Sequence, residues 1–313
     1  SQTYHNRGDS VSSFAAKYVS GIEDIGAKVD FDYVLNPQHY IRFGTNLTQH
    51  SFTPGAFELQ DNQINTTPFD TIINPDASVS TEYSLYVEDE MTLFNSLKMN
   101  VGLHYSGFLV EGASYNSLQP RIGLNYKLPG NVAIKASFAT MTQYVHLLTS
   151  GGLGLPTDLW VPSTEKIKPQ QSWQAAIGAA KTINDEYEVS IEGFYKQMKN
   201  VVSYKEGASF FTGFGTDWQT KVTQGDGEAY GLEFFLQKKR GRTTGWVGYT
   251  LAWNNRTFPE INGGETYPFR YDRRHDISVV VAHDLSERIS ISGAWIFGTG
   301  NAVSLPTARY SVG

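Results

Sequence analysis

Carboxylates and histidines are the residues of this sequence whose types and spacing could support catalysis or metal binding. Glu88, Asp89 and Glu90 stand side by side, and neighbouring carboxylates can act as general acid and general base. The sequence has seven histidines. It has no HExxH motif, no histidine pair at metal-ligand spacing within one strand, and no serine in a GxSxG motif. The acidic run falls at the end of a predicted strand, where carboxylates stay solvated, so we expect no enzyme activity, no metal and no cofactor.

Two further segments resemble ligand-binding motifs. Residues 225–231, GDGEAYG, resemble a glycine-rich phosphate loop, but such a loop opens a helix and no helical periodicity follows it here. We expect these glycines to begin a strand. Residues 271–276, YDRRHD, combine acidic, basic and histidine side chains that could bind a ligand. We favour a structural role for them, as the charged start of a strand.

Composition excludes several classes of protein. The chain has 313 residues, of which 40% are hydrophobic and 13% aromatic, so it is neither disordered nor of the helical-membrane type. Its longest apolar runs, such as residues 277–282, are too short for a transmembrane helix. Cysteine is absent, which excludes disulfides, zinc ribbons and thiol catalysis. A net charge of -6 gives no electrostatic reason to expect nucleic acid as a partner.

The dominant pattern along the chain is alternation of apolar and polar residues. Leu124 and Tyr126 before the Pro129–Gly130 turn, and Ile134 after it, alternate with polar residues, which places the apolar set on one face of each strand. Most predicted strands have ten or more residues, longer than the five or six usual in globular proteins. The pattern predicts thirteen strands, at residues 11–20, 23–35, 39–52, 79–93, 97–110, 117–128, 131–142, 170–183, 186–199, 224–239, 243–256, 274–284 and 287–299.

The connections between these strands are of two kinds. One set is tight, at residues 36–38, 93–96, 128–131, 184–185, 240–242 and 285–287. The other set is mostly long, at residues 53–78, 143–169, 200–223 and 257–273, with shorter members at 20–24 and 111–116. Successive connections of an antiparallel meander fall at opposite ends of the sheet, so we expect all the tight turns at one end. This asymmetry, together with long alternating strands, is typical of an outer-membrane β-barrel.

The predicted fold class is therefore all-β, an antiparallel up-and-down transmembrane β-barrel with its apolar face toward lipid. A barrel of about thirteen or more strands is too wide for side chains to fill, so a soluble sandwich or lipocalin-like barrel with the apolar face inward is the less favoured alternative. Aromatic residues fit the interfacial girdles of such barrels: Tyr105, Tyr126, Tyr187, Trp173, Trp246 and Trp253. The polar residues expected to face the lumen are Arg121, Lys135, Glu188, Glu192 and Glu233.

Several segments resemble the barrel of TonB-dependent outer-membrane receptors, in particular the Bacteroidetes-type members. The resemblance rests on residues 80–105, 118–143, 227–241 and 267–306, and above all on YDRRHD at 271–276 followed by GTGNAV at 298–303. It implies a transporter of the bacterial outer membrane that takes up a scarce solute of the siderophore, cobalamin, peptide or glycan class. The partners it implies are outer-membrane lipid, the TonB complex that supplies the energy, and a surface lipoprotein.

The resemblance also implies parts of a receptor that this sequence does not display. Such barrels have twenty-two strands, against about thirteen predicted here. We therefore expect residues 1–313 to be part of a single barrel domain, with the N-terminal plug domain, its TonB-binding segment and the terminal strands outside this chain. A passive outer-membrane porin, and an outer-membrane adhesin or structural barrel, are the alternatives.

Aromatic residues in the long connections are the candidates for solute binding. Exposed apolar clusters often mark binding surfaces, and aromatic rings provide contact area at low entropic cost. The alternative is that they pack the loops together or anchor them at the lipid headgroups. Alternation weakens after Phe138, so the strand can end inside the mouth of the barrel; with continued alternation, its next residues would face lipid. The candidates are Tyr144, His146, Trp160, Phe211, Trp218 and Tyr267.

Overall fold

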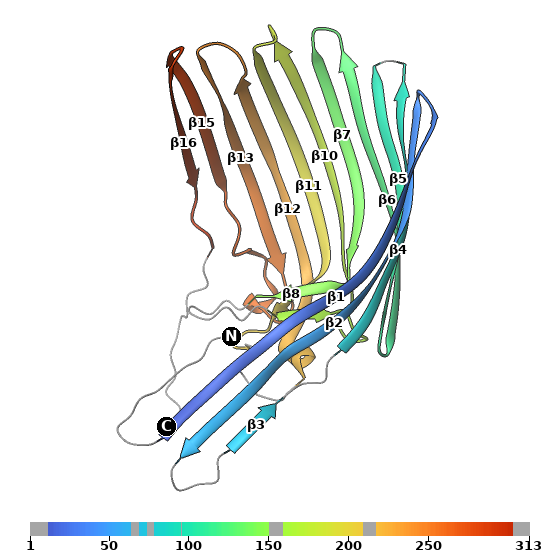
Figure 1. Cartoon of the computed structure of the whole chain (residues 1–313), viewed down its shortest axis with the longest axis vertical. Helices are drawn as coiled ribbons and strands as arrows, with labels where there is room; N and C mark the ends of the chain where they lie inside the picture. The colour runs from blue at the N-terminus through green and yellow to red at the C-terminus, as the bar shows by residue number, and fades with distance from the viewer. Residues whose placement is uncertain are drawn as a thin grey trace.

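The alternating segments form one large, curved antiparallel sheet (Figure 1). The computed structural model describes residues 12–63, 69–73, 78–94, 96–149, 159–208 and 217–302, and only the backbone of residues 12–19, 54–63 and 69–73. Twelve strands follow one another across the sheet in chain order: β1 (Ser12–Asn36), β2 (His39–Gln63), β4 (Ser78–Leu93), β5 (Leu97–Val110), β6 (Ala113–Leu128), β7 (Val132–Gln143), β10 (Gln170–Ile183), β11 (Tyr187–Tyr204), β12 (Val222–Lys238), β13 (Thr243–Thr257), β15 (His275–Ser286) and β16 (Ile289–Gly298).

Short elements occupy the connections that were predicted as long loops. Strand β3 (Phe69–Ile73) pairs with β2, and β14 (Tyr267–Pro268) pairs with β13. A separate two-stranded sheet is formed by β8 (Val145–Leu148) and β9 (Leu159–Pro162). The helical elements of the described residues are two 3₁₀ turns, η1 (Trp218–Lys221) and η2 (Asn262–Gly264), and none is long and apolar enough to cross a membrane.

The predicted tight turns gather at one end of the sheet and the long connections at the other, where the β5–β6 turn is the short exception (Figure 1). We refer to these as the turn end and the loop end. Between β6 and β7 the chain reverses through Gly130 and Asn131, with φ of 78° and 58°. This left-handed conformation suits glycine and asparagine and matches the twist of a hairpin.

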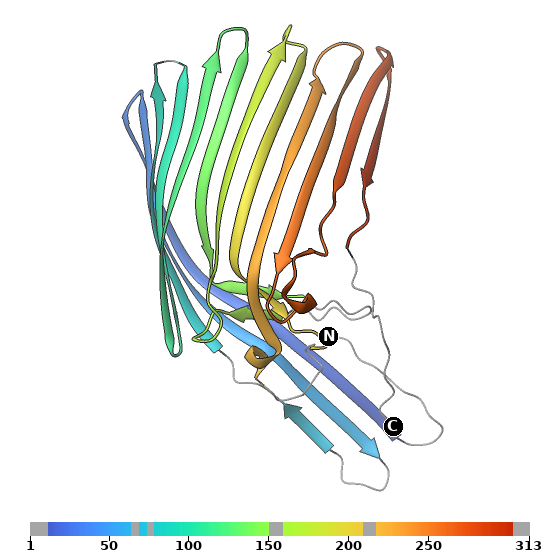
Figure 2. The same cartoon turned by 180° about the vertical axis from the view of Figure 1, so that it is seen from behind.

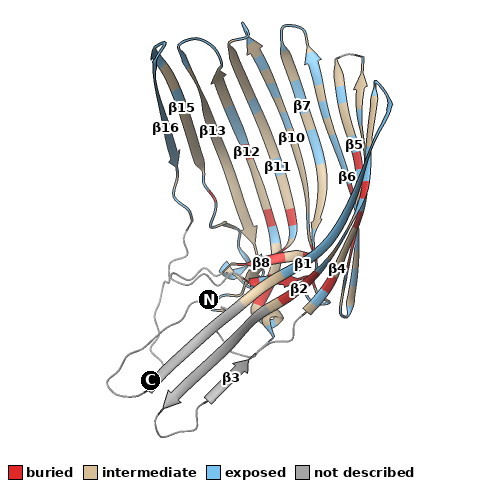
Figure 3. Ribbon diagram, viewed as in Figure 1, coloured by how far each residue is buried: buried red, intermediate tan, exposed pale blue. Residues whose placement is uncertain are grey.

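The strand register separates a convex apolar face from a concave polar face. Directly opposed residues of antiparallel strands share a face; Leu124 opposes Ala136, whereas Asn125 opposes Lys135. The β1–β2 edge of the sheet curves across the loop end, in front of the other strands in Figure 1 and behind them in Figure 2. Buried residues gather at this end of the concave face, as Figure 3 shows.

A row of aromatic side chains crosses the convex face near the loop end. The ring centroids of Trp173 and Tyr195 lie 5.3 Å apart, those of Tyr195 and Tyr230 6.3 Å apart, and those of Tyr230 and Trp253 5.3 Å apart. The guanidinium of Arg274 lies 4.6 Å from the centroid of the Trp253 ring. Such a row matches the aromatic girdle of a membrane barrel.

The same row continues onto β4 and β5, where the hydroxyls of Tyr83 and Tyr105 both donate to Asn116 Oδ1, at 3.0 and 2.9 Å. Among the other predicted girdle residues, Tyr126 and Tyr187 lie on the convex face near the turn end. The girdle assignment of Trp246 is wrong: it opposes Gln237 and Val280, which places it on the concave face with Glu188.

Several predicted strand boundaries are also wrong, most of all that of the strand predicted at 39–52, because β2 runs on to Gln63. The predicted strands at 11–20 and 23–35 are one continuous strand, β1, with an irregularity in the register between Val19 and Gly21. The polar segment at 20–24 looked like a turn, but its residues pair in register with β2. The predicted loop at 111–116 is a two-residue turn at Glu111 and Gly112, because β6 begins at Ala113.

Candidate functional site

The segment between β7 and β10 folds back over the concave face at the loop end. Strand β7 ends at Gln143, and β8 and β9 follow as a separate hairpin, which we call the mouth hairpin. Strand β9 contacts β1 and β2, whereas β8 contacts β11. The mouth hairpin therefore lies between the two sides of the curved sheet, as both ribbon views show (Figures 1 and 2).

One face of the mouth hairpin is buried in a hydrophobic cluster. The other face carries Leu147 and Trp160, which oppose each other and are each 39% exposed. Full burial of an aliphatic side chain contributes about 1.5–3 kcal/mol, so several such residues fix the hairpin on the concave face. The cluster consists of Leu148, Leu159, Val161, Ile167 and Val222, with Val202, Tyr204 and Trp218 packed against it.

Tyr144 connects the mouth hairpin to the wall of the sheet. Its ring stacks on Phe108 with centroids 5.0 Å apart and an interplanar angle of 4°. Its hydroxyl lies 2.8 Å from Ser106 Oγ, which also accepts a hydrogen bond of 2.7 Å from Gln119 Nε2. Tyr144 therefore lies on the concave side of the sheet. It is only 2% exposed, so little of its surface is free to contact a solute.

His146 is held inside the mouth hairpin as a neutral side chain. Its Nε2 lies 3.0 Å from Ser163 Oγ, and the residue is 3% exposed. Burial disfavours the charged imidazolium and lowers the pKa of His146 to about 4. At neutral pH His146 therefore takes part in hydrogen bonding without carrying charge.

A polar group on the neighbouring strands was not identified from the sequence. His50 of β2 is 7% exposed, and its Nδ1 lies 2.7 Å from Asp24 Oδ1 of β1. Its Nε2 lies 3.6 Å from Glu82 Oε2 of β4, and Ser80 directly opposes it in the register. We call Asp24, His50, Ser80 and Glu82 the His50 centre. The only feature of these residues in the sequence is their place in the alternating pattern, which puts all four on the concave face of their strands.

The concave face toward the turn end carries charges in opposed pairs. Arg42 Nε lies 3.2 Å from Asp32 Oδ1, and Arg42 Nη1 lies 3.3 Å from Glu88 Oε1. Arg121 is close to this group, because Gly102 opposes both Glu88 and Arg121. Within the acidic run at 88–90, Glu88 therefore forms an ion pair on the concave face.

The structure places all five residues predicted to face the lumen on the concave face. Lys135 and Glu192 line a groove of about 390 Å³ together with Glu90 and Lys98. Glu233 directly opposes Glu192 across β11 and β12. Arg121 is on the same face, and Glu188 is paired with Lys239 near the turn end.

The remaining candidates for solute binding lie in different surroundings. Trp218 packs on the cluster of the mouth hairpin, so the structure brings it together with β8 and β9. Tyr267 belongs to a second cluster, where its ring lies 6.4 Å from that of Phe258, and burial raises its pKa. Phe211 lies outside the described residues.

The two remaining sequence motifs, residues 225–231 and 271–276, have structural roles. Residues 225–231 lie within β12, which confirms the prediction of a strand. In the segment 271–276, Asp272 accepts a hydrogen bond of 2.7 Å from the backbone N–H of Asn254 and pairs with Arg274 at 3.1 Å. These bonds fix the start of β15 against β13.

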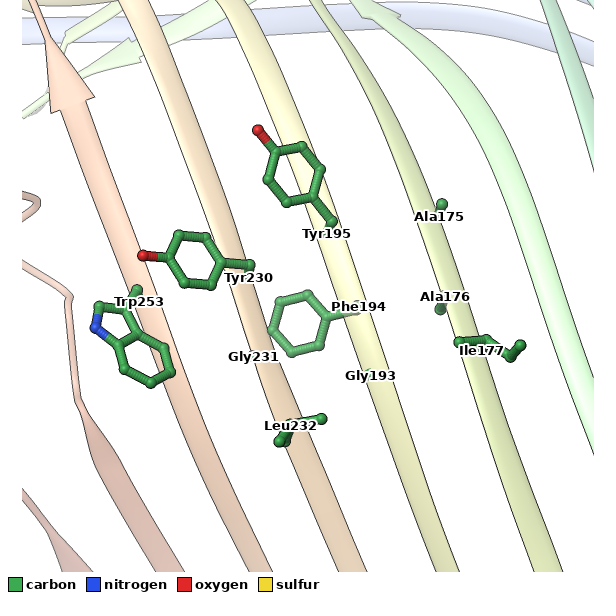
Figure 4. Close-up of a pocket in the computed structure, with 10 residues that line it drawn as sticks. All are labelled: Ala175, Ala176, Ile177, Gly193, Phe194, Tyr195, Tyr230, Gly231, Leu232 and Trp253. Atoms are coloured by element: carbon green, nitrogen blue, oxygen red, sulfur yellow. The ribbon is translucent and has the colours of Figure 1, made fainter.

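A groove of about 530 Å³ lies on the convex face between β10, β11, β12 and β13 (Figure 4). Ile177, Gly193 and Leu232 oppose one another across the strands along its length, and Tyr195, Tyr230 and Trp253 form its end toward the loops. Its lining is apolar and aromatic. This surface suits acyl chains, and its polar side-chain atoms are those of Tyr195, Tyr230 and Trp253.

Within the part of the chain that the structure describes, no group of three or more histidine and acidic side chains could hold a metal ion. The polar side chains of the concave face instead form pairs and short ladders. Such a wall can bind a polar or charged solute by hydrogen bonds and ion pairs.

Comparisons with known proteins identify the family. The family model described as "TonB dependent receptor-like, beta-barrel" matches residues 1–312. A search of curated proteins found no match.

Solved structures with this fold include transporters and a receptor. The FrpB iron transporter from Neisseria meningitidis (F3-3 variant) shares 13% identity at a TM-score of 0.63, over 90% of this chain and 46% of that chain. The copper transporter OprC shares 11% identity at a TM-score of 0.64, over 91% and 43%. The siderophore receptor PirA from Acinetobacter baumannii shares 15% identity at a TM-score of 0.56, over 95% and 45%.

At these identities the similarity to solved structures shows the fold, and this chain spans just under half the length of each. The family match extends over nearly the whole chain. The sheet, with its apolar convex face and polar concave face, has the construction of an outer-membrane barrel wall. The chain therefore belongs to the family of TonB-dependent receptor-like β-barrels of the outer membrane.

Proposed function

We propose that the protein carrying this chain imports a scarce solute across the outer membrane with energy from the TonB complex. The observation that carries the proposal is the mouth hairpin, which crosses the concave side at the loop end and is buried on one face. A segment fixed there by hydrophobic packing obstructs passive diffusion of large solutes. Membership of the family supports coupling to TonB.

The solute belongs to the siderophore, cobalamin, peptide or glycan class in this proposal. By their names, the similar solved proteins include an iron transporter, a copper transporter and a siderophore receptor, so siderophores loaded with metal are the first solutes to test. The proposal requires a plug and a TonB-binding segment elsewhere in the protein, and it allows a surface lipoprotein as partner. In the closed barrel, Arg121, Lys135, Glu188, Glu192 and Glu233 would line the lumen.

Uptake of labelled solute by intact cells tests the proposal. We expect saturable accumulation that disappears when tonB is deleted or the proton gradient is collapsed. A porin would instead give uptake that rises linearly with concentration and is insensitive to both treatments. An adhesin or structural barrel would give no uptake that depends on the protein.

Orientation follows from the same proposal, because the long loops of outer-membrane barrels are extracellular and the short turns periplasmic. The chain contains no cysteine, so single cysteines can be placed at will. Glu265 in a long connection and Glu287 in a tight turn are both exposed. A membrane-impermeant maleimide should label Glu265→Cys on intact cells and leave Glu287→Cys unlabelled; the reverse pattern would invert the assignment.

The solute contacts proposed for the loop end are aromatic. Trp160 is partly exposed beside the concave side, and Trp218 is partly buried against the mouth hairpin; Phe211 and Tyr267 complete the proposed set. Tyr144 and His146 are buried, so we assign them the role of holding the hairpin. Trp160, Phe211 and Trp218 should each be replaced by alanine and solute affinity measured on the purified receptor. Unchanged affinity in all three would leave the apex of the plug as the binding site.

A further inference from the structure

The His50 centre contains two buried polar atoms without a hydrogen-bond partner. His50 is 7% exposed and Ser80 is 2% exposed, and both His50 Nε2 and Ser80 Oγ are unpartnered. The two residues oppose each other on β2 and β4, so their side chains lie on the same face of neighbouring strands. Buried polar groups nearly always have a partner in protein, ordered water or a bound ligand. Two unpartnered atoms on opposed residues therefore point to a ligand.

The orientation of the imidazole favours a cation as that ligand. Asp24 is an acceptor 2.7 Å from His50 Nδ1, so this nitrogen carries a proton, and in the neutral imidazole that binds a metal the lone pair is on Nε2. A carboxylate behind the imidazole is the usual second contact of a histidine that binds metal, since it fixes the tautomer and makes the free nitrogen more basic. Nε2 is directed toward Glu82, whose Oε2 lies 3.6 Å away.

The separation of 3.6 Å fits two ligands of one metal ion. Metal–nitrogen and metal–oxygen bonds of about 2.0–2.2 Å would span it with an angle of roughly 120° at the metal. A direct hydrogen bond is excluded at this distance. A bridging water would need an angle of about 80° between its two bonds if each were 2.8 Å long, which is far from the usual geometry.

The charges of the His50 centre also favour a cation as its ligand. Asp24 and Glu82 have His50 as their ion-pair partner among the described residues, and no lysine or arginine of that part of the chain pairs with either. With a neutral imidazole the centre carries two negative charges beside the buried His50 and Ser80. A divalent cation would balance them.

We infer that the His50 centre is a binding site for a divalent metal ion of borderline softness, such as Zn²⁺ or Cu²⁺, on the inner wall of the barrel. His50 Nε2 and a Glu82 oxygen are the ligands, Ser80 Oγ is a third donor, and Asp24 orients the imidazole. Imidazole with carboxylate is a donor set that suits these ions. Two strong donors and a hydroxyl leave further coordination positions of the metal to water.

Zn²⁺ titration of the purified full-length receptor in detergent, against a chromophoric chelator, tests the inference. The wild type should show a saturable site. His50→Ala and Glu82→Gln should each weaken it at least tenfold, and Asp24→Asn should weaken it about tenfold, within the range known for contacts behind a ligand. Glu82→Gln preserves shape at a partly exposed position, so it reports on the site even if His50→Ala perturbs folding.

His39 provides the matched control. Its Nδ1 lies 2.7 Å from Asp89 Oδ2, as in the His50 pair, but on the convex face near the turn end. His39→Ala should leave Zn²⁺ affinity unchanged. Absence of saturable binding in the wild type, or wild-type affinity in both His50→Ala and Glu82→Gln, would overturn the metal site and leave a simple ion pair.

Discussion

Phe94 and Phe108 belong to the same hairpin of the sheet but have opposite surroundings. Phe94 lies in the tight turn between β4 and β5 and is 89% exposed, whereas Phe108, near the loop end of β5, is 0% exposed beneath Tyr144. At the turn end the strands are joined by short turns and the backbone ladder. At the loop end, side chains from the wall and the mouth hairpin form a packed interior.

The buried hydrophobic side chains of the described residues show the same contrast. Apart from Phe52, which lies within β2 opposite the first residue of β4, they lie toward the loop ends of their strands or in the connections beyond them. Between the two ends, the convex face exposes apolar residues that only lipid can cover. The loop end is therefore stabilised by its own packed side chains, whereas the middle of the sheet depends on lipid to cover its apolar face.

The largest effect is expected at the packed end. Phe108→Ala should cost about 3–5 kcal/mol of unfolding free energy, because it empties a fully buried aromatic site. Phe94→Ala should stay within about 0.5 kcal/mol, as an exposed substitution. Urea unfolding of the receptor in lipid vesicles measures both. Similar losses for the two variants would remove the contrast between the ends.

The lipid-covered middle of the wall gives the next largest effect. Leu103→Arg or Leu124→Arg on the convex face should cost about 2–4 kcal/mol near the bilayer midplane. Asn100→Arg or Asn125→Arg, on the concave face, should be tolerated far better. The same vesicle unfolding assay compares the pairs, and equal sensitivity would mean that the two faces are assigned wrongly.

Acid should loosen the mouth hairpin selectively. The unfolded segment takes up a proton near the ordinary His pKa of 6.5, whereas folded His146 does so only near pKa 4. Stability of the hairpin should therefore fall as the pH drops from about 6.5 to about 4, by up to about 1.4 kcal/mol per pH unit. Hydrogen exchange of β8 and β9 amides follows this, with the β15–β16 turn as reference. His146→Asn should flatten the pH dependence; an unchanged profile would contradict the assignment.

The smallest effect belongs to an ion pair at the turn end. Lys98 Nζ lies 4.0 Å from Glu90 Oε1, and about half of each side chain is exposed. Pairs of this kind contribute about 0–1 kcal/mol and are weakened by salt, so Lys98→Ala should change stability by less than about 0.5 kcal/mol. The difference between variant and wild type should vanish in 1 M salt, and a larger, salt-independent loss would show that the turn end is also packed.

The central strands could be predicted from the sequence because each carries its own signal. Alternation places β5 and β10 at residues 97–110 and 170–183, the bounds that the structure has. Tight turns with glycine or asparagine mark their ends. The prediction fails at residues 20–24, 53–63, 145–148 and 159–162, which resemble connections but pair as strands.

The site could be predicted only in part, for a physical reason. Tyr144 and His146 stood out because alternation weakens before them, and the structure does bring them inside the concave side. His50 and Phe108 gave no local signal of their burial. Their burial depends on contacts between segments far apart in the chain, and a pattern of period two reports only which face a residue occupies.

The position of the mouth hairpin imposes an order on assembly of the barrel. Strand β9 contacts β1 and β2, strands from a much earlier part of the chain, and contacts of such long sequence separation form slowly because the intervening loop must close first. Docking of the mouth hairpin onto β1 and β2 is therefore a late folding step, which follows the pairing of the strands that it contacts.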